Sequence, residues 1–244
     1  MPDVEKVIVG KGVIKRFGGM TAVNNVDFDL RKGEILGLIG PNGAGKTTLF
    51  NCISGFLSAD EGTITLLGTQ IHKQHPDKIC HLGLGRTFQA AKNFPDLSVR
   101  ENVRMSALFG NKGVSYAEAE NITDEIMTFT GLDKYTCMAV PDMPLPLQKR
   151  LELARALAIR PIILLIDETM AGLNPAEVNE AMELVRKIRD SGITVHMIEH
   201  VMKAIMSICD RIIVLHHGVV IAEGAPDAVV NNPQVIEIYL GEEA

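Results

Sequence analysis

The chain has 244 residues, of which 46% are hydrophobic and 22% charged, a balance typical of a globular protein that buries a sizeable core. Its formal net charge of −6 disfavours nucleic-acid binding, because that requires a basic surface that displaces counterions from phosphates. No apolar run approaches the roughly 20 residues that cross a bilayer, so we expect a soluble chain whose role at any membrane depends on partners.

The first part of the chain has the pattern of strands that lead into a glycine-rich loop. Val23–Leu30 alternates apolar and polar residues as a half-buried strand does, and Ile35–Ile39 indicates a short buried strand. After Lys46, apolar residues recur at helical spacing, and Gly55 is a suitable stop for that helix. Thr63–Leu67 follows a turn and predicts a further short strand.

A helical stretch separates this region from a second set of strands. From about Phe94 to Ala158 the sequence is rich in Glu and has almost no β-branched runs. Ile162–Asp167 then returns to an apolar strand, and a helical pattern follows it. Ile193–Ile198 and Arg211–Leu215 indicate more strands. Strands and helices that alternate on both sides of a helical stretch predict a parallel α/β core with a helical insertion.

Eight consecutive residues from Gly40 match the pattern G-x-x-x-x-G-K-[ST], and they lie between a predicted strand and a predicted helix, as this pattern requires. The glycines let main-chain N–H groups converge on phosphate oxygens, and the helix N-terminus adds a favourable dipole. Lys46 is placed to bridge the β- and γ-phosphates, and Thr47 to give a hydroxyl to Mg²⁺. The predicted nucleotide-binding residues of this loop are Gly40, Asn42, Gly43, Ala44, Gly45, Lys46, Thr47 and Thr48.

Two acidic residues end the second apolar strand. Asp167 is placed to hold Mg²⁺, and Glu168 to polarise the attacking water as a general base. Such a pair is often only a solvated turn, but together with a phosphate loop it predicts nucleotide hydrolysis. A guanine-specific enzyme is disfavoured, because Asn111–Val114 lacks the final acid of the Asn-Lys-x-Asp element that usually reads guanine.

With these motifs the chain resembles the ATP-binding subunits of ABC transporters along nearly its whole length. The resemblance implies that Phe17 stacks on adenine, that Gln89 contacts Mg²⁺ or water and senses a membrane subunit, and that His200 contacts the γ-phosphate. Taken singly, a Phe can be a core residue, a Gln usually lies on the surface without a role, and a His is more often structural, so the position in the family pattern gives these residues their weight. The implied catalytic residues are Lys46, Gln89, Glu168 and His200, and the implied Mg²⁺ ligands are Thr47, Gln89 and Asp167.

Further segments are similar to the ATPases of branched-chain amino-acid importers. They are Phe17–Gly19, Gly85–Gln89, Ala171–Pro175 and Ile236–Gly241, the third of which has Asn174 where the family more often has Asp. This resemblance implies a bacterial-type complex in which the chain is peripheral to the cytoplasmic face of the inner membrane. Its implied partners are a second ATPase subunit, two transmembrane permease subunits and, indirectly, a periplasmic solute-binding protein.

The family resemblance also implies a fold. We expect one nucleotide-binding domain over residues 1–244, with a P-loop α/β core and an N-terminal antiparallel β portion. The helical insertion is expected at about residues 92–158. ATP would be sandwiched between two such subunits and would close their dimer.

One segment departs from the family pattern. The family signature, Leu-Ser-Gly-Gly-Gln or a close variant, precedes an Arg-rich helix that Leu151–Leu157 matches. Counting back from that helix puts Met143–Leu147 on the signature. Pro144 replaces the serine hydroxyl and Pro146 replaces a glycine N–H, so two expected phosphate donors are missing. We therefore expect an asymmetric heterodimer with a different ATPase subunit that has an intact signature.

Two other functions stay open on the sequence. An ABC ATPase of DNA repair or translation would usually carry a long coiled-coil insertion or a tandem copy, and neither is visible. A regulatory nucleotide-binding module with little turnover is favoured by the altered signature. The intact phosphate loop, acidic pair and His200 disfavour it.

Overall fold

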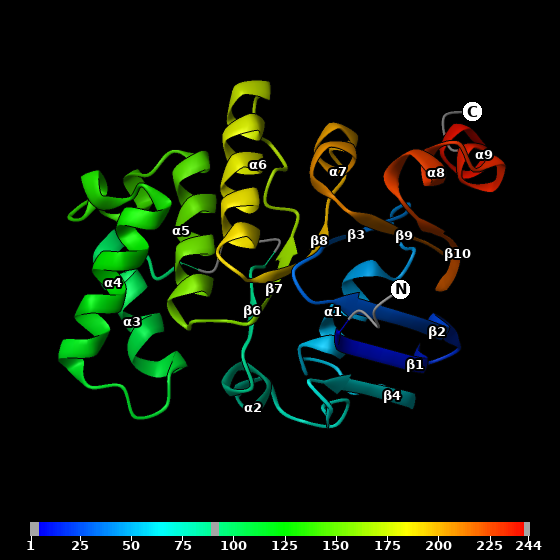
Figure 1. The fold of residues 1–244 in the computed structure, drawn as a ribbon, viewed down its shortest axis with the longest axis horizontal. Coiled ribbons are helices and arrows are strands. Elements are labelled where there is room, and N and C mark those ends of the chain that lie inside the picture. Colours follow the sequence, from blue (N-terminus) through cyan, green and yellow to red (C-terminus); the bar gives the residue numbers. More distant parts are fainter. Residues whose placement is uncertain (1–4, 89–92, 242–244) are drawn as a thin grey trace.

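The chain folds into two β-sheets and a set of helices, and Figure 1 shows the helices α3, α4 and α5 gathered at one end of the molecule. The computed structural model describes residues 5–88 and 93–241. Its elements are β1 (Lys6–Phe17), β2 (Met20–Arg31), β3 (Ile35–Ile39), α1 (Lys46–Ile53), β4 (Glu61–Leu66), β5 (Thr69–Gln70), α2 (Pro76–His81), β6 (Leu84–Arg86), α3 (Val99–Gly110), α4 (Tyr116–Thr130), two 3₁₀ helices (Asp133–Tyr135 and Val140–Asp142), α5 (Leu145–Ala158), β7 (Ile163–Asp167), α6 (Pro175–Asp190), β8 (Thr194–Ile198), α7 (Met202–Ile208), β9 (Arg211–His216), β10 (Val219–Gly224), α8 (Pro226–Val230) and α9 (Pro233–Gly241).

The N-terminal sheet is antiparallel, with the strand order β2-β1-β4-β5. The alternating strand predicted at Val23–Leu30 is the central part of β2. Its partner β1 was not predicted, because register shifts at several points interrupt its apolar alternation. Gly10 of β1 leaves room for the ring of Phe28, since a Cβ atom there would lie 2.1 Å from that ring. The expected N-terminal antiparallel portion is thus confirmed.

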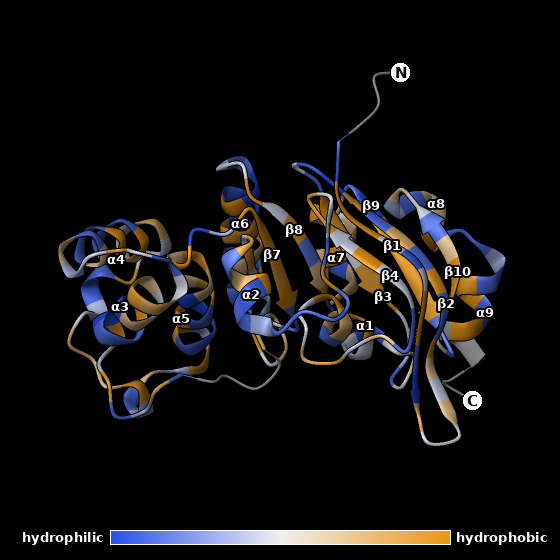
Figure 2. Ribbon diagram, turned by 90° about the horizontal axis from the view of Figure 1, so that it is seen from below, coloured by the Kyte–Doolittle hydropathy of each residue, from blue (hydrophilic) through white to orange (hydrophobic). Residues whose placement is uncertain are grey.

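The second sheet has six strands in the order β10-β9-β3-β8-β7-β6. Its strands are parallel except for β10, which pairs antiparallel with β9 at one edge. Strands β3, β7 and β8 are buried along their whole lengths and are hydrophobic throughout most of them (Figure 2), as strands covered on both faces must be. The carboxyl ends of β3, β7 and β8 therefore lie side by side, and this edge carries the phosphate loop, the acidic pair and His200.

Helices cover both faces of this second sheet. On one face, Leu36 and Leu38 of β3 pack in a core shared with α1 and the antiparallel sheet. On the other face, Ile35 and Ile39 pack in a core shared with α5, α6 and α7. The alternating side chains of β3 thus join the two halves of the hydrophobic interior.

The predicted helical insertion is present between β6 and β7 as α3, α4 and α5. These helices share a hydrophobic core of their own, which includes Val103, Ile122 and Leu151. Helices α3 and α4 each begin at a capping box, formed in α3 by Ser98 and Glu101. Local sequence therefore starts these helices, and apolar packing holds them together.

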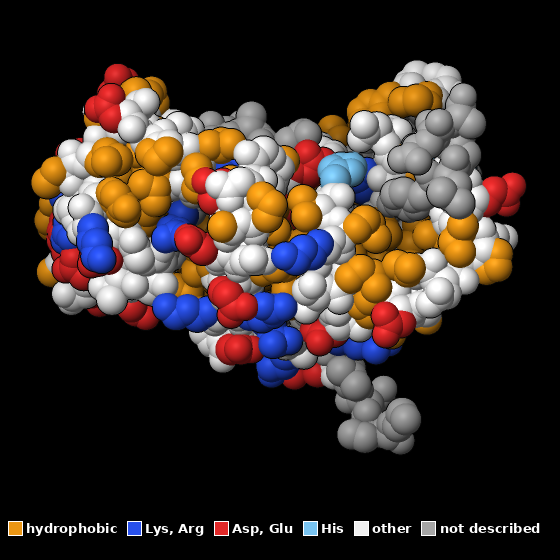
Figure 3. All heavy atoms as spheres, turned by 90° about the horizontal axis from the view of Figure 1, so that it is seen from above, with side chains coloured by type: hydrophobic (Ala, Val, Ile, Leu, Met, Phe, Trp, Pro, Cys, Tyr) orange, Lys and Arg blue, Asp and Glu red, His pale blue; other side chains and the backbone are white. Residues whose placement is uncertain are grey.

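Surface charges of both signs are interspersed. On the face seen in Figure 3, Lys and Arg side chains alternate with Asp and Glu and with apolar side chains. In the molecule as a whole, Arg150 pairs with Glu180 at 2.9 Å and Arg160 with Glu125 at 3.1 Å. Exposed pairs of this kind contribute about 1 kcal/mol or less to stability, so packing dominates the fold.

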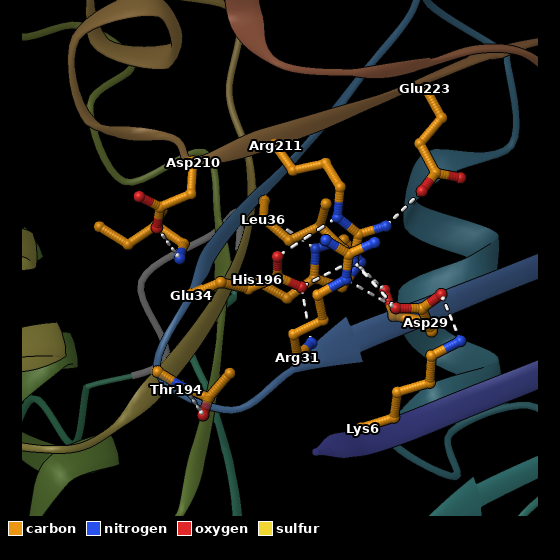
Figure 4. Close-up of polar contacts among 12 residues, drawn as sticks. Lys6, Asp29, Arg31, Glu34, Leu36, Thr194, His196, Asp210, Arg211 and Glu223 are labelled. Atoms are coloured by element: carbon orange, nitrogen blue, oxygen red, sulfur yellow. Dashed lines mark hydrogen bonds and ion pairs between the residues drawn. The ribbon is translucent and has the colours of Figure 1, made fainter. Parts of the chain in front are cut away.

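A buried ion network joins the two sheets (Figure 4). Arg211 of β9 lies 2.7 Å from Glu34, which precedes β3, and 3.2 Å from Asp29 of β2. It also pairs with Glu223 of β10. Since every partner carries the opposite charge, the cost of burying Arg211 is offset. The network fixes β10, an edge strand of the six-stranded sheet, and β2, an edge strand of the antiparallel sheet, against β9.

His196 lies in the middle of β8 and should make the fold sensitive to acid. Its side chain is buried, with Nδ1 3.0 Å from the carbonyl oxygen of Leu36 and its ring against Phe50. Burial lowers the pKa of His196 from 6.5 to about 4. The unfolded chain therefore binds more protons than the folded chain between these values, so stability should fall as pH falls from 6.5 to 4, by up to roughly 3 kcal/mol.

Urea unfolding of the wild type and of His196→Gln across this pH range measures the effect. The variant should be less stable at pH 7 but should lose less additional stability on acidification. Burial raises the pKa of Glu199 from 4.5 to about 7, which acts in the opposite direction but equally in both proteins. Parallel stability curves for the two proteins would show that His196 does not titrate in this way.

Candidate active site

The phosphate loop lines a groove of about 320 Å³. The loop joins β3 to α1, and its neighbours in the groove come from the end of β1, the start of β2 and the segment after β7. Three segments far apart in the sequence thus meet at one place. The residues lining the groove are Phe17, Met20, Ala22, Asn42, Gly43, Ala44, Gly45, Lys46, Thr47, Thr48 and Glu168.

Glycine is required at two positions of the loop. Gly40 has φ +150° and Gly45 has φ +104°, which side-chain-bearing residues rarely adopt. A Cβ atom on Gly40 would lie 2.0 Å from the carbonyl oxygen of Leu215, and one on Gly45 would lie 2.2 Å from that of Ala22. The loop can therefore pass this close to the neighbouring strands only with these two glycines.

Lys46 is the first residue of α1, and its ammonium group folds back onto the start of the phosphate loop. Its Nζ donates to the carbonyl oxygens of Gly40 and Pro41, at 2.6 and 2.9 Å. Thr47, the next residue, is exposed to the groove. A cation and a hydroxyl at the start of a helix, beside main-chain N–H groups, form a site for a phosphate chain.

Asp167 is buried at the end of β7, where an arginine holds it. Its Oδ2 lies 3.0 Å from Nη2 of Arg86, and its main-chain N–H donates to the hydroxyl of Thr87. Burial raises the pKa of Asp167, while the neighbouring guanidinium opposes that rise. Its other oxygen, Oδ1, has no hydrogen-bond partner among residues 5–88 and 93–241. An oxygen left in this way, with the hydroxyl of Thr47, suits a Mg²⁺ ion.

Glu168 and His200 are in direct contact. Nε2 of His200 lies 2.8 Å from Oε1 of Glu168, so the ring donates this hydrogen bond to the carboxylate. Glu168 has φ +51°, a conformation that costs an ordinary residue about 1–3 kcal/mol and is common at functional sites. Its main-chain N–H donates to the carbonyl oxygen of Ile198, which fixes this turn against β8. The arrangement orients a carboxylate toward the groove, where it can accept a proton from water.

Two further predicted features, Phe17 and the segment Met143–Leu147, lie in the described part of the chain. Gln89 lies outside the residues that the structure describes. Phe17, at the end of β1, lines the groove and is 44% exposed, so its ring is open to a flat ligand rather than part of the core. Met143–Leu147 spans the start of α5, with Pro144 as the N-cap residue.

Three residues next to the site were missed by the sequence analysis. Arg86 was quoted in a motif but was given no role, although it pairs with Asp167. Lys149 and Glu199 were given none either, although both are buried beside Glu168. The one available signal was a charged residue within an apolar helical face or at the end of an apolar strand.

The fold and the site define the class of protein. A family model described as "ABC transporter" matches residues 23–171, and one described as "Branched-chain amino acid ATP-binding cassette transporter" matches residues 219–244. The chain therefore belongs to the ABC transporter family, as one of its ATP-hydrolysing, ATP-binding subunits.

Individual relatives show to which group of ABC transporter subunits the chain is similar. The chain is 39% identical to the high-affinity branched-chain amino acid transport ATP-binding protein LivG of Salmonella typhimurium, over 98% of this chain and 99% of LivG. It is 37% identical to the corresponding protein BraF of Pseudomonas aeruginosa, over 95% of this chain and 96% of BraF. The predicted resemblance to this group is confirmed.

Solved structures agree on the fold. The ADP conformation of MJ1267, an ATP-binding cassette of an ABC transporter, superposes with a TM-score of 0.88 at 29% identity, covering 97% of this chain and 99% of that one. CbiO1 of Clostridium perfringens, part of the transporter complex cbiONQ, gives a TM-score of 0.84 at 25% identity, covering 98% and 97%. The predicted P-loop fold of the ABC type is confirmed.

Proposed function

We propose that this chain, as one nucleotide-binding domain, drives an importer of branched-chain amino acids or related small solutes. The observation that carries the proposal is the similarity to LivG and BraF over nearly the whole length of all three chains. The match of residues 219–244 to the branched-chain amino acid model supports the same group of solutes.

Each part of the groove has a proposed role toward Mg²⁺-ATP. Phe17 stacks on adenine, and the phosphate loop with Lys46 holds the β- and γ-phosphates. Bound Mg²⁺ neutralises phosphate charge, and its proposed ligands are Thr47, Gln89 and Asp167. Glu168 takes a proton from the attacking water, and His200 orients that carboxylate and reaches the γ-phosphate. Their hydrogen bond and their common edge of the sheet support this assignment.

A second groove supports the proposal that this chain binds a membrane subunit. It has a volume of about 330 Å³ and lies between α2, β6, the second half of α3 and α5, with apolar walls that include Phe56, Phe88 and Ile159. Arg86 lines this second groove and also pairs with Asp167, so it links the groove to the acidic pair of the ATP site. We propose that a permease subunit docks here, with this chain peripheral to the cytoplasmic face of the inner membrane. No helix in the described part of the chain has the length and apolar character needed to cross a bilayer.

The second ATPase subunit is proposed to be a different protein. Pro146 has no N–H, and the N–H of Leu147 donates to the carbonyl oxygen of Pro144 at 3.0 Å. The first turn of α5 therefore offers a partner's phosphates fewer donors than the family signature would. This chain's own phosphate loop and acidic pair are complete. ATP bound to them can therefore be contacted and hydrolysed with an intact signature from another subunit.

Transport by the assembled complex tests the function. The chain would be reconstituted in liposomes with two permease subunits, a second ATPase and a solute-binding protein, and ATP-dependent uptake of radiolabelled leucine, isoleucine and valine would be measured. We expect uptake of these solutes, with maltose as the unrelated control. ATP turnover that the permease subunits leave unchanged, with no uptake, would favour the regulatory module instead.

A further inference from the structure

A buried carboxylate joins the two loops that carry Glu168 and His200. Glu199 directly follows β8 and is 2% exposed. Its Oε1 accepts a hydrogen bond of 2.8 Å from the main-chain N–H of Met170, two residues after Glu168. Burial raises the pKa of Glu199, and the main-chain N–H groups of Met170 and His200 both oppose that rise. One side chain thus holds the backbone on both sides of the hydrogen-bonded Glu168–His200 pair.

A buried lysine extends this contact to a helix. Lys149 lies in α5, and its Nζ donates to the main-chain carbonyl oxygen of Glu168 at 3.4 Å. Its charge also stabilises the ionised form of Glu199, against the burial that raises the pKa of Glu199 to about 7. Lys149 and Glu199 are thus both buried and both bind the main chain of the turn after β7, at Glu168 and at Met170.

These contacts matter because the segment after β7 has no regular structure to hold it. Glu168 has φ +51°, and residues 168–174 form turns between β7 and α6. A strained residue keeps its conformation only where its surroundings over-determine it. Glu199 and Lys149 reach this turn from two other elements, β8 and α5, so they supply that constraint.

We propose that Glu199 and Lys149 form a positioning pair that aligns Glu168 with His200 and ties both to α5. The inference rests on the proposed function, in which Glu168 is the general base. Lys149 lies one helical turn after Leu145, so the pair also joins the catalytic turn to the segment Met143–Leu147, which faces the partner's nucleotide in the proposed dimer.

The test compares Glu199→Gln, Lys149→Met and the double variant in the assembled complex. Each single variant should lower kcat for ATP hydrolysis about 10-fold or more and leave KM for ATP within about twofold, because the phosphate loop is untouched. Because both side chains hold the same turn, removing the second should cost less once the first is gone, so the fold-loss of kcat in the double variant should be smaller than the product of the two single fold-losses by at least about threefold. Glu183→Gln, on the exposed side of α6 with a side chain 72% exposed, is the matched control.

A loss of kcat with a proportional rise in KM, or losses that simply multiply in the double variant, would overturn the positioning pair. Glu199→Asp, which keeps the charge on a shorter stem, should keep more activity than Glu199→Gln. Equal losses from these two changes would contradict the proposal. If Glu199→Gln does not fold, Glu199→Asp is tested by the same criterion, a loss of kcat with KM for ATP within about twofold. A wild-type complex that hydrolyses ATP without importing amino acids would contradict the proposed function alone. An active importer in which the pair variants match Glu183→Gln would contradict this inference alone.

Discussion

Replacing Glu168 with glutamine should lower ATP turnover of the assembled complex by roughly 10²–10⁴-fold while ATP still binds. Glutamine keeps the size of the side chain, and its amide oxygen can still accept the hydrogen bond from Nε2 of His200. The amide cannot take a proton from the attacking water, so the loss falls on the chemical step. The bound nucleotide should therefore persist.

Turnover is measured as phosphate release, and ATP binding as ATP-dependent closure of the dimer by light scattering. The wild type should close and reopen, whereas Glu168→Gln should stay closed. Glu183→Gln, a change of the same kind on an exposed side chain, should behave as the wild type does. If ATP affinity fell together with turnover, Glu168 would be a structural residue or a metal ligand rather than the base.

The second large effect is an asymmetry between the two ATP sites. In the proposed heterodimer, Glu168→Gln in this chain should abolish most ATPase activity, whereas the matching change in the partner subunit should be tolerated. Each missing hydrogen bond to a charged phosphate costs roughly 1.5–3 kcal/mol. Two missing donors, at Pro144 and Pro146, would slow the opposite site by about 10²–10⁴-fold at 1.36 kcal/mol per decade.

The double change Pro144→Ser and Pro146→Gly provides a gain-of-function control. Pro144 has φ −64° and ψ 153° as the N-cap of α5, which serine adopts readily and favours at that position. Turnover at the opposite site should rise, and the partner's glutamine variant should then no longer be tolerated. Equal loss from the two glutamine variants in the original complex, or vigorous ATPase activity of this chain alone, would contradict the asymmetry.

Features of this protein that depend on local backbone chemistry could be predicted from the amino-acid sequence. Apolar runs predicted β3, β7 and β8, because strands buried on both faces have no polar side to interrupt the pattern. The phosphate loop was predicted because glycines and a lysine at fixed spacing suit only a few structures. Where apolar alternation was broken, as in β1 with its register shifts, the same reasoning gave no strand.

The side chains that support the site could not be predicted, because long-range contacts bring them together. Arg86 and Asp167 are 81 residues apart in the chain, and Glu199 and Met170 are 29 apart. Such contacts depend on the order of strands in the sheet and on the packing of α5 against it, and neither leaves a periodic trace in the sequence. Lys149 and Glu199 look like ordinary polar residues until the fold buries each of them against the turn that carries Glu168.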